Sequence, residues 1–144
     1  MKHSPTRLAV LALAAALGSN TAQAAAPLEV RLTGVQHARG AIRVGLYADD
    51  KTFRKEAQAL ALQQVPATPG NVVVRFDDLA PGRYAIMAYH DEDGNGEMNR
   101  RFGMFPTEGY GLSNNPQVVG PPAFADSAFE AGEKAHTITI ELRY

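Results

Sequence analysis

Residues 71–90, NVVVRFDDLAPGRYAIMAYH, decide the predicted fold of this chain. Residues 72–76 predict a strand. The Pro-Gly pair at 81–82 fills the two central positions of a four-residue turn, as a type II turn requires. From residue 83 to 90 both alternating sets of side chains are apolar, which predicts a central strand covered on both faces. We therefore expect a β-hairpin over residues 71–90.

Alternation of period two continues on both sides of this segment. Residues 28–35, 41–47 and 136–142 each place apolar side chains on one face, which is typical of strands buried on one side. Residues 124–129 fit a further short strand. Between the second strand and Pro66, Asp49 or Asp50 can cap a helix start. We expect one short helix there, lying over an edge or a face of the sheet.

The long segment 91–122 is rich in Gly, Pro and Asn and shows no sustained period. It also carries several large apolar residues, which predicts an ordered loop and not disorder. With six or seven short strands, one short helix and this loop, the chain is predicted to be all-β, a single antiparallel β-sandwich. A small outer-membrane barrel is the alternative. It needs about eight strands of about nine to eleven residues, and most strands here are shorter.

The first 24 residues predict a secretory signal peptide. A basic start is followed by an apolar run at 8–17, which is too short to span a bilayer, and by a small-x-small cleavage site at 22–24. A short N-terminal anchor helix is the alternative. We expect one β-sandwich domain over residues 25–144, in the periplasm or secreted, with no transmembrane segment in the mature chain.

The composition limits the partners of the mature chain. The chain contains no cysteine, so a small exported domain must be stabilised by its core or by a metal. Residues 25–144 keep 12 basic and 15 acidic residues, because only Lys2 and Arg7 are removed, and the net charge becomes −3. This charge argues against nucleic-acid binding, which usually needs a basic surface. It identifies neither a ligand nor a protein partner.

The stretch HDEDGNGEMNRRFG at residues 90–103 carries the main candidate site. Oxygen-bearing side chains fall at loop positions 1, 3, 5 and 9, a glycine at position 6 permits the sharp turn, and the carbonyl at position 7 can add a ligand. Donors that are all oxygen favour calcium over softer metals. Position 12, however, is Phe102, where a bidentate Glu is expected, so another carboxylate must contribute. The predicted calcium ligands are Asp91, Asp93, Asn95, Glu97, Asn99 and Glu108.

Two alternatives to calcium remain at this loop. The first is a metal-free turn, in which Asp and Asn side chains accept hydrogen bonds from nearby backbone N–H groups. The second is another divalent ion.

Enzyme activity is not expected from this sequence. A nucleophilic triad needs an oriented base within reach of a nucleophile, and the chain shows neither a nucleophile elbow nor a cysteine. We interpret His90 as a strand-end residue that bonds the loop. The alternative is a small periplasmic hydrolase that uses His90 and a loop carboxylate. Tyr110, between two glycines, fits either a ligand platform or a ring packed on the sheet.

Two longer stretches carry a family resemblance. Residues 76–96 read FDDLAPGRYAIMAYHDEDGNG, residues 103–115 read GMFPTEGYGLSNN, and an apolar strand follows to the end of the chain. Together they resemble the exported bacterial proteins of domain of unknown function 2141, over nearly the whole mature chain. The piece 79–84 is also similar to hairpins of transthyretin-like and carboxypeptidase-regulatory-like sandwiches. The resemblance implies a β-sandwich and supplies no activity, so we expect an exported binding or accessory module.

Overall fold

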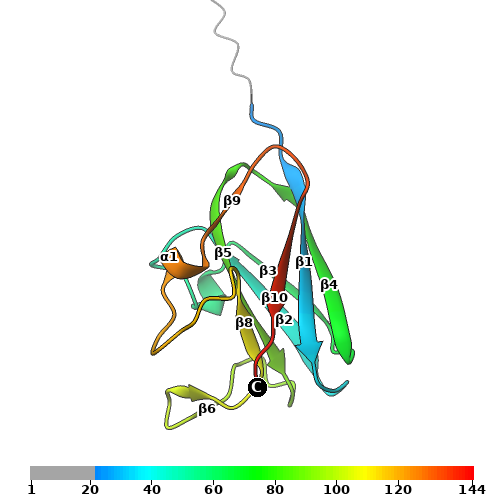
Figure 1. Ribbon diagram of the computed structural model, residues 1–144, viewed down its shortest axis with the longest axis vertical. Coiled ribbons are helices and arrows are strands. Elements are labelled where there is room, and N and C mark those ends of the chain that lie inside the picture. The colour runs from blue at the N-terminus through cyan, green and yellow to red at the C-terminus, as the bar shows by residue number, and fades with distance from the viewer. Residues whose placement is uncertain (1–21) are drawn as a thin grey trace, which may run out of the picture.

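The computed structural model describes residues 22–144, so nearly all of the predicted signal peptide lies outside the described residues. Strands dominate the chain (Figure 1). The elements are β1 (Ala26–Val35), β2 (Ala41–Tyr47), the 3-10 helix η1 (Glu56–Gln58), β3 (Ala61–Pro66), β4 (Gly70–Leu79), β5 (Gly82–Asp91), β6 (Arg100–Arg101), β7 (Phe105–Pro106), β8 (Tyr110–Leu112), α1 (Phe124–Ser127), β9 (Phe129–Ala131) and β10 (His136–Glu141).

The strands form two main sheets and one small hairpin. One sheet has the order β10-β1-β4 and the other the order β3-β2-β5-β8, with β9 pairing to the beginning of β5. Within the described part of the chain, strands β6 and β7 pair only with each other. All pairs are antiparallel except β1 with β10, which is parallel. The predicted all-β class is confirmed, and this parallel pair departs from the purely antiparallel sheet that we expected.

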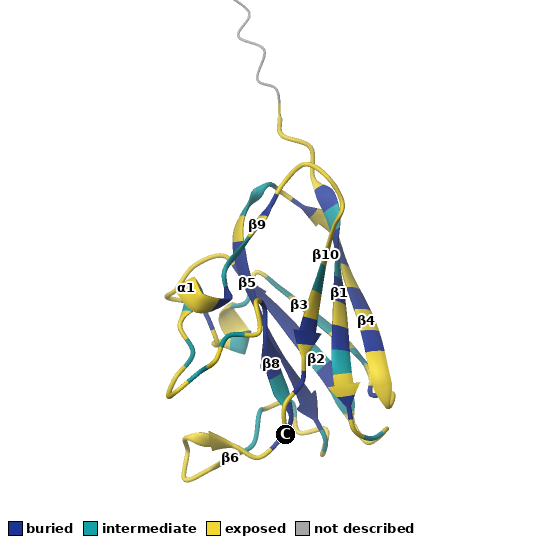
Figure 2. Cartoon of the chain, in the orientation of Figure 1, coloured by how far each residue is buried: buried dark blue, intermediate teal, exposed yellow. Residues whose placement is uncertain are grey.

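The two main sheets share one apolar core (Figure 2). Alternate side chains of β1 and β2 point into it, as the period-two pattern of these strands predicts. Its fully buried members include Val30, Leu32, Ile42, Val44, Ile86 and Ile140.

Strand β5 is central, as its two apolar faces predicted. It pairs with β2 along seven residues and with β8 along three. Ile86 and Ala88 face the shared core, while Ala85 and Met87 belong to a second apolar cluster with Phe53 on the other face. Both faces of β5 are therefore covered.

The hairpin expected over residues 71–90 does not form. Strand β4 pairs with β1, where Val74 lies opposite Val30, whereas β5 pairs with β2, where Ala88 lies opposite Val44. The Pro-Gly turn between β4 and β5 therefore carries the chain from one sheet to the other. A Pro-Gly turn reverses the chain both in a hairpin and in a connection between two sheets. Only tertiary pairing decides whether the two strands that it joins lie in one sheet.

The short helix expected between Asp49 and Pro66 is also wrong. Asp49 does cap a turn, since its Oδ1 accepts the Thr52 N–H at 2.9 Å, but only the three residues of η1 are helical. Strand β3 follows and pairs with β2. Within β3 partly buried and exposed residues alternate, so the strand period prevails where an open edge of β2 is available.

Two further segments complete the chain. The strand expected over residues 124–129 is replaced by the single helical turn α1, followed by β9. The expected ordered loop at 91–122 contains β8 and the β6–β7 hairpin. Within residues 22–144, no helix has the length and hydropathy to cross a bilayer.

Candidate metal site in the loop between β5 and β8

Pairing of β5 with β8 determines where the acidic loop begins and ends. Tyr89 lies opposite Tyr110 in this antiparallel ladder, and the His90 N–H donates to the Gly109 carbonyl at 2.8 Å. Asp91 and Glu108 lie two residues beyond the last pair of this ladder, and an oxygen of each lies within 4.8 Å of one of the other. Residues 17 positions apart in the sequence are thus brought close together, and the loop between them is closed at its base.

Asp91 and Glu108 are both buried carboxylates, with 2% and 5% of their surface exposed. Glu108 accepts the Glu92 N–H on Oε1 at 2.9 Å and the Asn99 N–H on Oε2 at 3.0 Å. Asp91 accepts the Gly96 N–H on Oδ2 at 3.0 Å, but its buried Oδ1 has no hydrogen-bond partner. A buried acceptor without a partner is costly, and a charged one more so.

Asp93 is exposed and adds a third carboxylate. Its Oδ1 accepts the Asn95 N–H at 3.1 Å, and its Oδ2 accepts the Asn99 side-chain amide at 2.8 Å. The amide of Asn99, with the Asn95 N–H, lowers the pKa of Asp93 below its usual value. Asp91, Asp93 and Glu108 each offer one oxygen within 4.8 Å of those of the other two.

The geometry of this acidic cluster suits a hard divalent cation. Calcium binds oxygen at about 2.3–2.6 Å, so two ligands on opposite sides of one ion lie about 5 Å apart. In residues 22–144, no ion pair joins Asp91, Asp93 or Glu108 to a basic side chain. Like charges at this distance repel each other. A bound cation would remove this repulsion and give Asp91 Oδ1 a partner.

The three predicted carboxylate ligands come together, and the predicted Asn99 is bonded to one of them, Asp93. Asn95 Oδ1 accepts the Glu97 N–H at 2.9 Å, and its Nδ2 donates to Asn99 Oδ1 at 2.7 Å, so both amides support the loop. The Glu97 side chain lines a neighbouring groove. In a calcium-binding loop that leads into a helix, alternate side chains converge on one ion. The loop of this protein instead joins two paired strands, β5 and β8.

The neighbouring groove is about 210 Å³ in volume and lies on the outer face of β5. Its floor includes Tyr47, Met87 and Tyr89. The Tyr89 hydroxyl donates to Glu56 Oε2 at 2.9 Å, and the Gly96 carbonyl, 3.1 Å away, is a second acceptor within the acidic loop. Burial, with the bond to Glu56, raises the pKa of Tyr89. This tyrosine therefore connects the loop to the sheet.

His90 packs inside the fold. It is fully buried, its Nε2 donates to the Arg39 carbonyl at 2.6 Å, and its Nδ1 lies 2.7 Å from the Tyr144 hydroxyl. The sequence predicts that His90 bonds the loop, whereas its partners come from another loop and from the last residue of the chain. His37 and Glu92 lie beside it and form a second potential metal-ligand group. Both His90 nitrogens are already occupied by protein partners.

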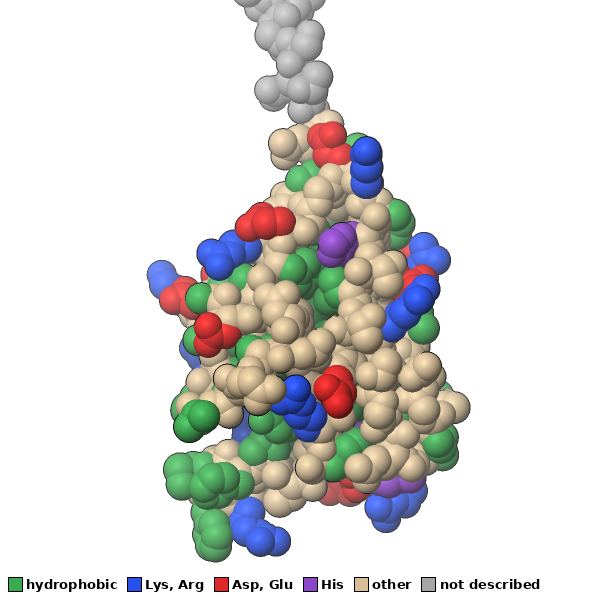
Figure 3. Space-filling model, in the orientation of Figure 1, with side chains coloured by type: hydrophobic (Ala, Val, Ile, Leu, Met, Phe, Trp, Pro, Cys, Tyr) green, Lys and Arg blue, Asp and Glu red, His purple; other side chains and the backbone are tan. Residues whose placement is uncertain are grey.

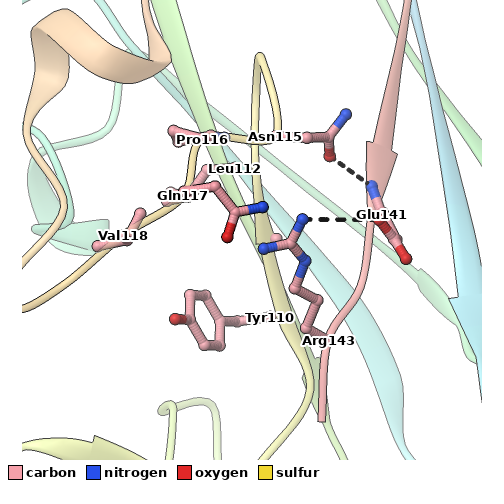
Figure 4. A pocket seen from close by; sticks show the side chains of 9 residues that line it. Tyr110, Leu112, Asn115, Pro116, Gln117, Val118, Glu141 and Arg143 are labelled. Carbon is pink, nitrogen blue, oxygen red and sulfur yellow. Dashed lines mark hydrogen bonds and ion pairs between the residues drawn. The ribbon is translucent and has the colours of Figure 1, made fainter.

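A second hollow lies between β8 and the end of the chain (Figure 4). Its volume is about 80 Å³, well below the roughly 300–1,000 Å³ of a typical ligand pocket. Arg143 and Asn115 line it, and each interacts with Glu141: the arginine by an ion pair of 3.7 Å, the amide oxygen by accepting the Glu141 N–H at 2.8 Å. Interactions within the protein therefore occupy both of these polar groups.

The glycines beside Tyr110 are explained by close packing. A Cβ at Gly109 would lie 2.4 Å from the Tyr144 ring, and one at Gly111 would lie 2.6 Å from the Glu141 carbonyl oxygen. Tyr110 itself is half-buried and packs on the second apolar cluster. Of the two interpretations of Tyr110, the ring packed on the sheet fits this position.

The fold and the loop define a small all-β module that carries a partly buried acidic cluster at one end. Residues 30–139 match a family model described as an uncharacterized protein conserved in bacteria, and the chain belongs to this family, DUF2141. The predicted resemblance is thereby confirmed. Searches of curated proteins and of solved structures gave no significant match.

Proposed function

We propose that this protein is an exported, non-enzymatic binding or accessory module, a single β-sandwich whose acidic loop binds calcium. One observation carries the proposal: the buried Asp91 Oδ1 has no partner, although two other carboxylates lie within 4.8 Å. Asp91, Asp93 and Glu108 would hold the ion. Calcium would supply the positive charge that two buried, neighbouring carboxylates lack, and would fix the two ends of the loop together.

Calcium fits this donor set better than its competitors. Every donor is an oxygen, which disfavours softer metals, and magnesium demands tighter octahedral geometry than calcium does. Since the bidentate Glu of strong calcium loops is missing, we expect a dissociation constant of about 10⁻⁴–10⁻³ M, as in extracellular modules. Such a site fills only where calcium is millimolar, which agrees with the proposed export.

The position of His90 supports a non-enzymatic role. Its two ring nitrogens are engaged by Arg39 and Tyr144, and the ring is fully buried. A hydrolase that used His90 as its base would need one of these nitrogens free and within reach of the substrate.

The metal dependence of thermal unfolding tests the proposal. At calcium about ten times the dissociation constant, linkage adds about 1.4 kcal/mol, so the melting temperature should rise by a few degrees. Magnesium should have a much smaller effect. Asp93→Asn should abolish the rise, while Asp78→Asn, at an exposed position on β4, should keep it. A calcium-independent melting temperature would favour the metal-free turn.

Export is tested separately. If residues 1–24 are a cleaved signal peptide, the mature protein should begin at Ala25 or within a few residues of it. Mass spectrometry of the exported form measures this directly, and an intact Met1 would contradict the proposed cleavage.

A further inference from the structure

The hairpin of β6 and β7, residues 99–107, presents an unusual group of exposed side chains. Phe102 is 83% exposed, Met104 68% and Phe105 61%, and Arg100 and Arg101 beside them are exposed too. Figure 3 shows apolar side chains gathered at the end of the molecule where Figure 1 labels β6, with a basic side chain next to them. Exposed apolar groups that lie together mark interaction sites more often than isolated ones do.

The backbone conformation at the tip of the hairpin does not favour an aromatic residue at position 102. The φ angle is positive at both Phe102 (53°) and Gly103 (69°), and the Met104 N–H donates to the Arg101 carbonyl at 3.2 Å. This pattern is that of a type I′ turn, in which Asn-Gly is preferred. A bulky residue with positive φ is a true outlier and costs free energy. Phe102 therefore weakens the turn while it places an exposed ring at the tip.

The base of the hairpin holds the tip at a fixed position. The Thr107 N–H donates to the Asn99 carbonyl at 2.9 Å, and the Asn99 N–H donates to the buried Glu108. Arg100 pairs with Pro106, and Arg101 with Phe105, across the hairpin. The exposed side chains thus sit on a short ordered arm and not on a free loop.

We propose that this hairpin docks the protein on an anionic lipid surface. Aromatic and methionine side chains can enter the boundary between headgroups and acyl chains, and arginines beside them can pair with anionic headgroups. In residues 22–144, neither Arg100 nor Arg101 forms an ion pair, so both guanidinium groups are available for this purpose. A stable protein interface needs about 20–30 residues from each partner, far more than this narrow tip presents.

Cosedimentation with lipid vesicles tests the proposal. The exported protein is mixed with vesicles of phosphatidylcholine alone or with added phosphatidylglycerol, in a chelator, so that the result does not depend on the calcium site. Phe102→Asn should reduce the partition coefficient by about tenfold or more, because the ring that would be buried in the membrane is lost. The same substitution should leave the melting temperature equal or higher, because Asn suits the turn. Replacing Arg100 and Arg101 by Ala should reduce binding by about tenfold, only on the anionic vesicles.

A matched control exists elsewhere on the surface. Val119 is also a fully exposed apolar residue but lies outside the hairpin, so Val119→Asn should bind vesicles like the unchanged protein. Failure of the unchanged protein to bind either vesicle, or equal binding by Phe102→Asn, would overturn the proposal. A concentration-dependent dimer that Phe102→Asn abolishes would overturn it as well, because the hairpin would then be a protein interface.

Discussion

Asp91, the last residue of β5, and Glu108, two residues before β8, each carry a buried carboxylate, and the two carboxylates lie close to each other. Glu108 is well satisfied, with two backbone N–H groups bonded to it, whereas Asp91 keeps one oxygen without a partner. The pair therefore has two separate tasks. Glu108 holds the two ends of the loop together through its hydrogen bonds, and Asp91 offers the unpartnered carboxylate oxygen that we propose binds calcium.

The structural task of Glu108 predicts a loss of stability that does not depend on calcium. In Glu108→Ala, the N–H groups of Glu92 and Asn99 lose their acceptor. An unsatisfied buried group costs about 1–3 kcal/mol, and because these two N–H groups are only partly buried, we expect a total loss of about 2–4 kcal/mol in the free energy of unfolding. Chemical denaturation in a chelator measures it. Glu133→Ala, at an exposed position, should change the value by less than about 0.5 kcal/mol. Equal stability of the two variants would mean that Glu108 does not close the loop.

The core-facing register of β5 predicts a larger cost for Ile86→Ala. Ile86 is fully buried in the core shared by the two sheets, so removal of its side chain leaves a cavity there. We expect a loss of about 2–5 kcal/mol, measured by urea denaturation. Val73→Ala is the matched control, because Val73 is an exposed aliphatic residue on β4. An unchanged midpoint for Ile86→Ala would show that this register is wrong.

The contact between His90 and Tyr144 predicts that the last residue of the chain contributes to stability. Tyr144→Phe removes the hydroxyl that lies 2.7 Å from His90 Nδ1 and that also accepts the Gln36 N–H at 3.3 Å. With His90 buried, we expect a loss of about 1–3 kcal/mol. Thermal or urea unfolding would measure it. In Tyr110→Phe, a half-buried ring loses the same hydroxyl, and the change should be small. Similar values for both variants would contradict this role of Tyr144.

Much of the fold could be predicted from local pattern. The strand over 41–47 has the predicted bounds, and the two apolar faces of residues 83–90 correctly place that strand inside a sheet. Strand alternation reports which side of a strand is buried, and this information is contained in the sequence itself. It does not report which strand lies beside which. The hairpin at 71–90 was therefore wrong, although both of its strands exist.

For the candidate site too, local sequence predicted part of the arrangement and long-range pairing decided the rest. Acidic and amide spacing identified the loop, and three predicted ligands, Asp91, Asp93 and Glu108, do come together. The amide of Asn99 donates to Asp93, and Asn95 Oδ1 accepts the Glu97 N–H, so both amides support the loop around these carboxylates. The partner of His90 could not be predicted, since Tyr144 is 54 residues away in the sequence and is placed by long-range pairing of β10 with β1 and of Arg143 with Tyr110.

The most direct test of the central claim is a calcium titration followed by the backbone amide resonances in ¹H–¹⁵N NMR spectra. The account predicts that the amides of Glu92, Gly96 and Asn99, which bond the clustered carboxylates, shift saturably with a dissociation constant of about 10⁻⁴–10⁻³ M. Asp91→Asn should remove the shifts, and Asp78→Asn should keep them. If these amides do not shift at calcium about ten times the upper value, the loop is a metal-free turn and the calcium proposal is contradicted.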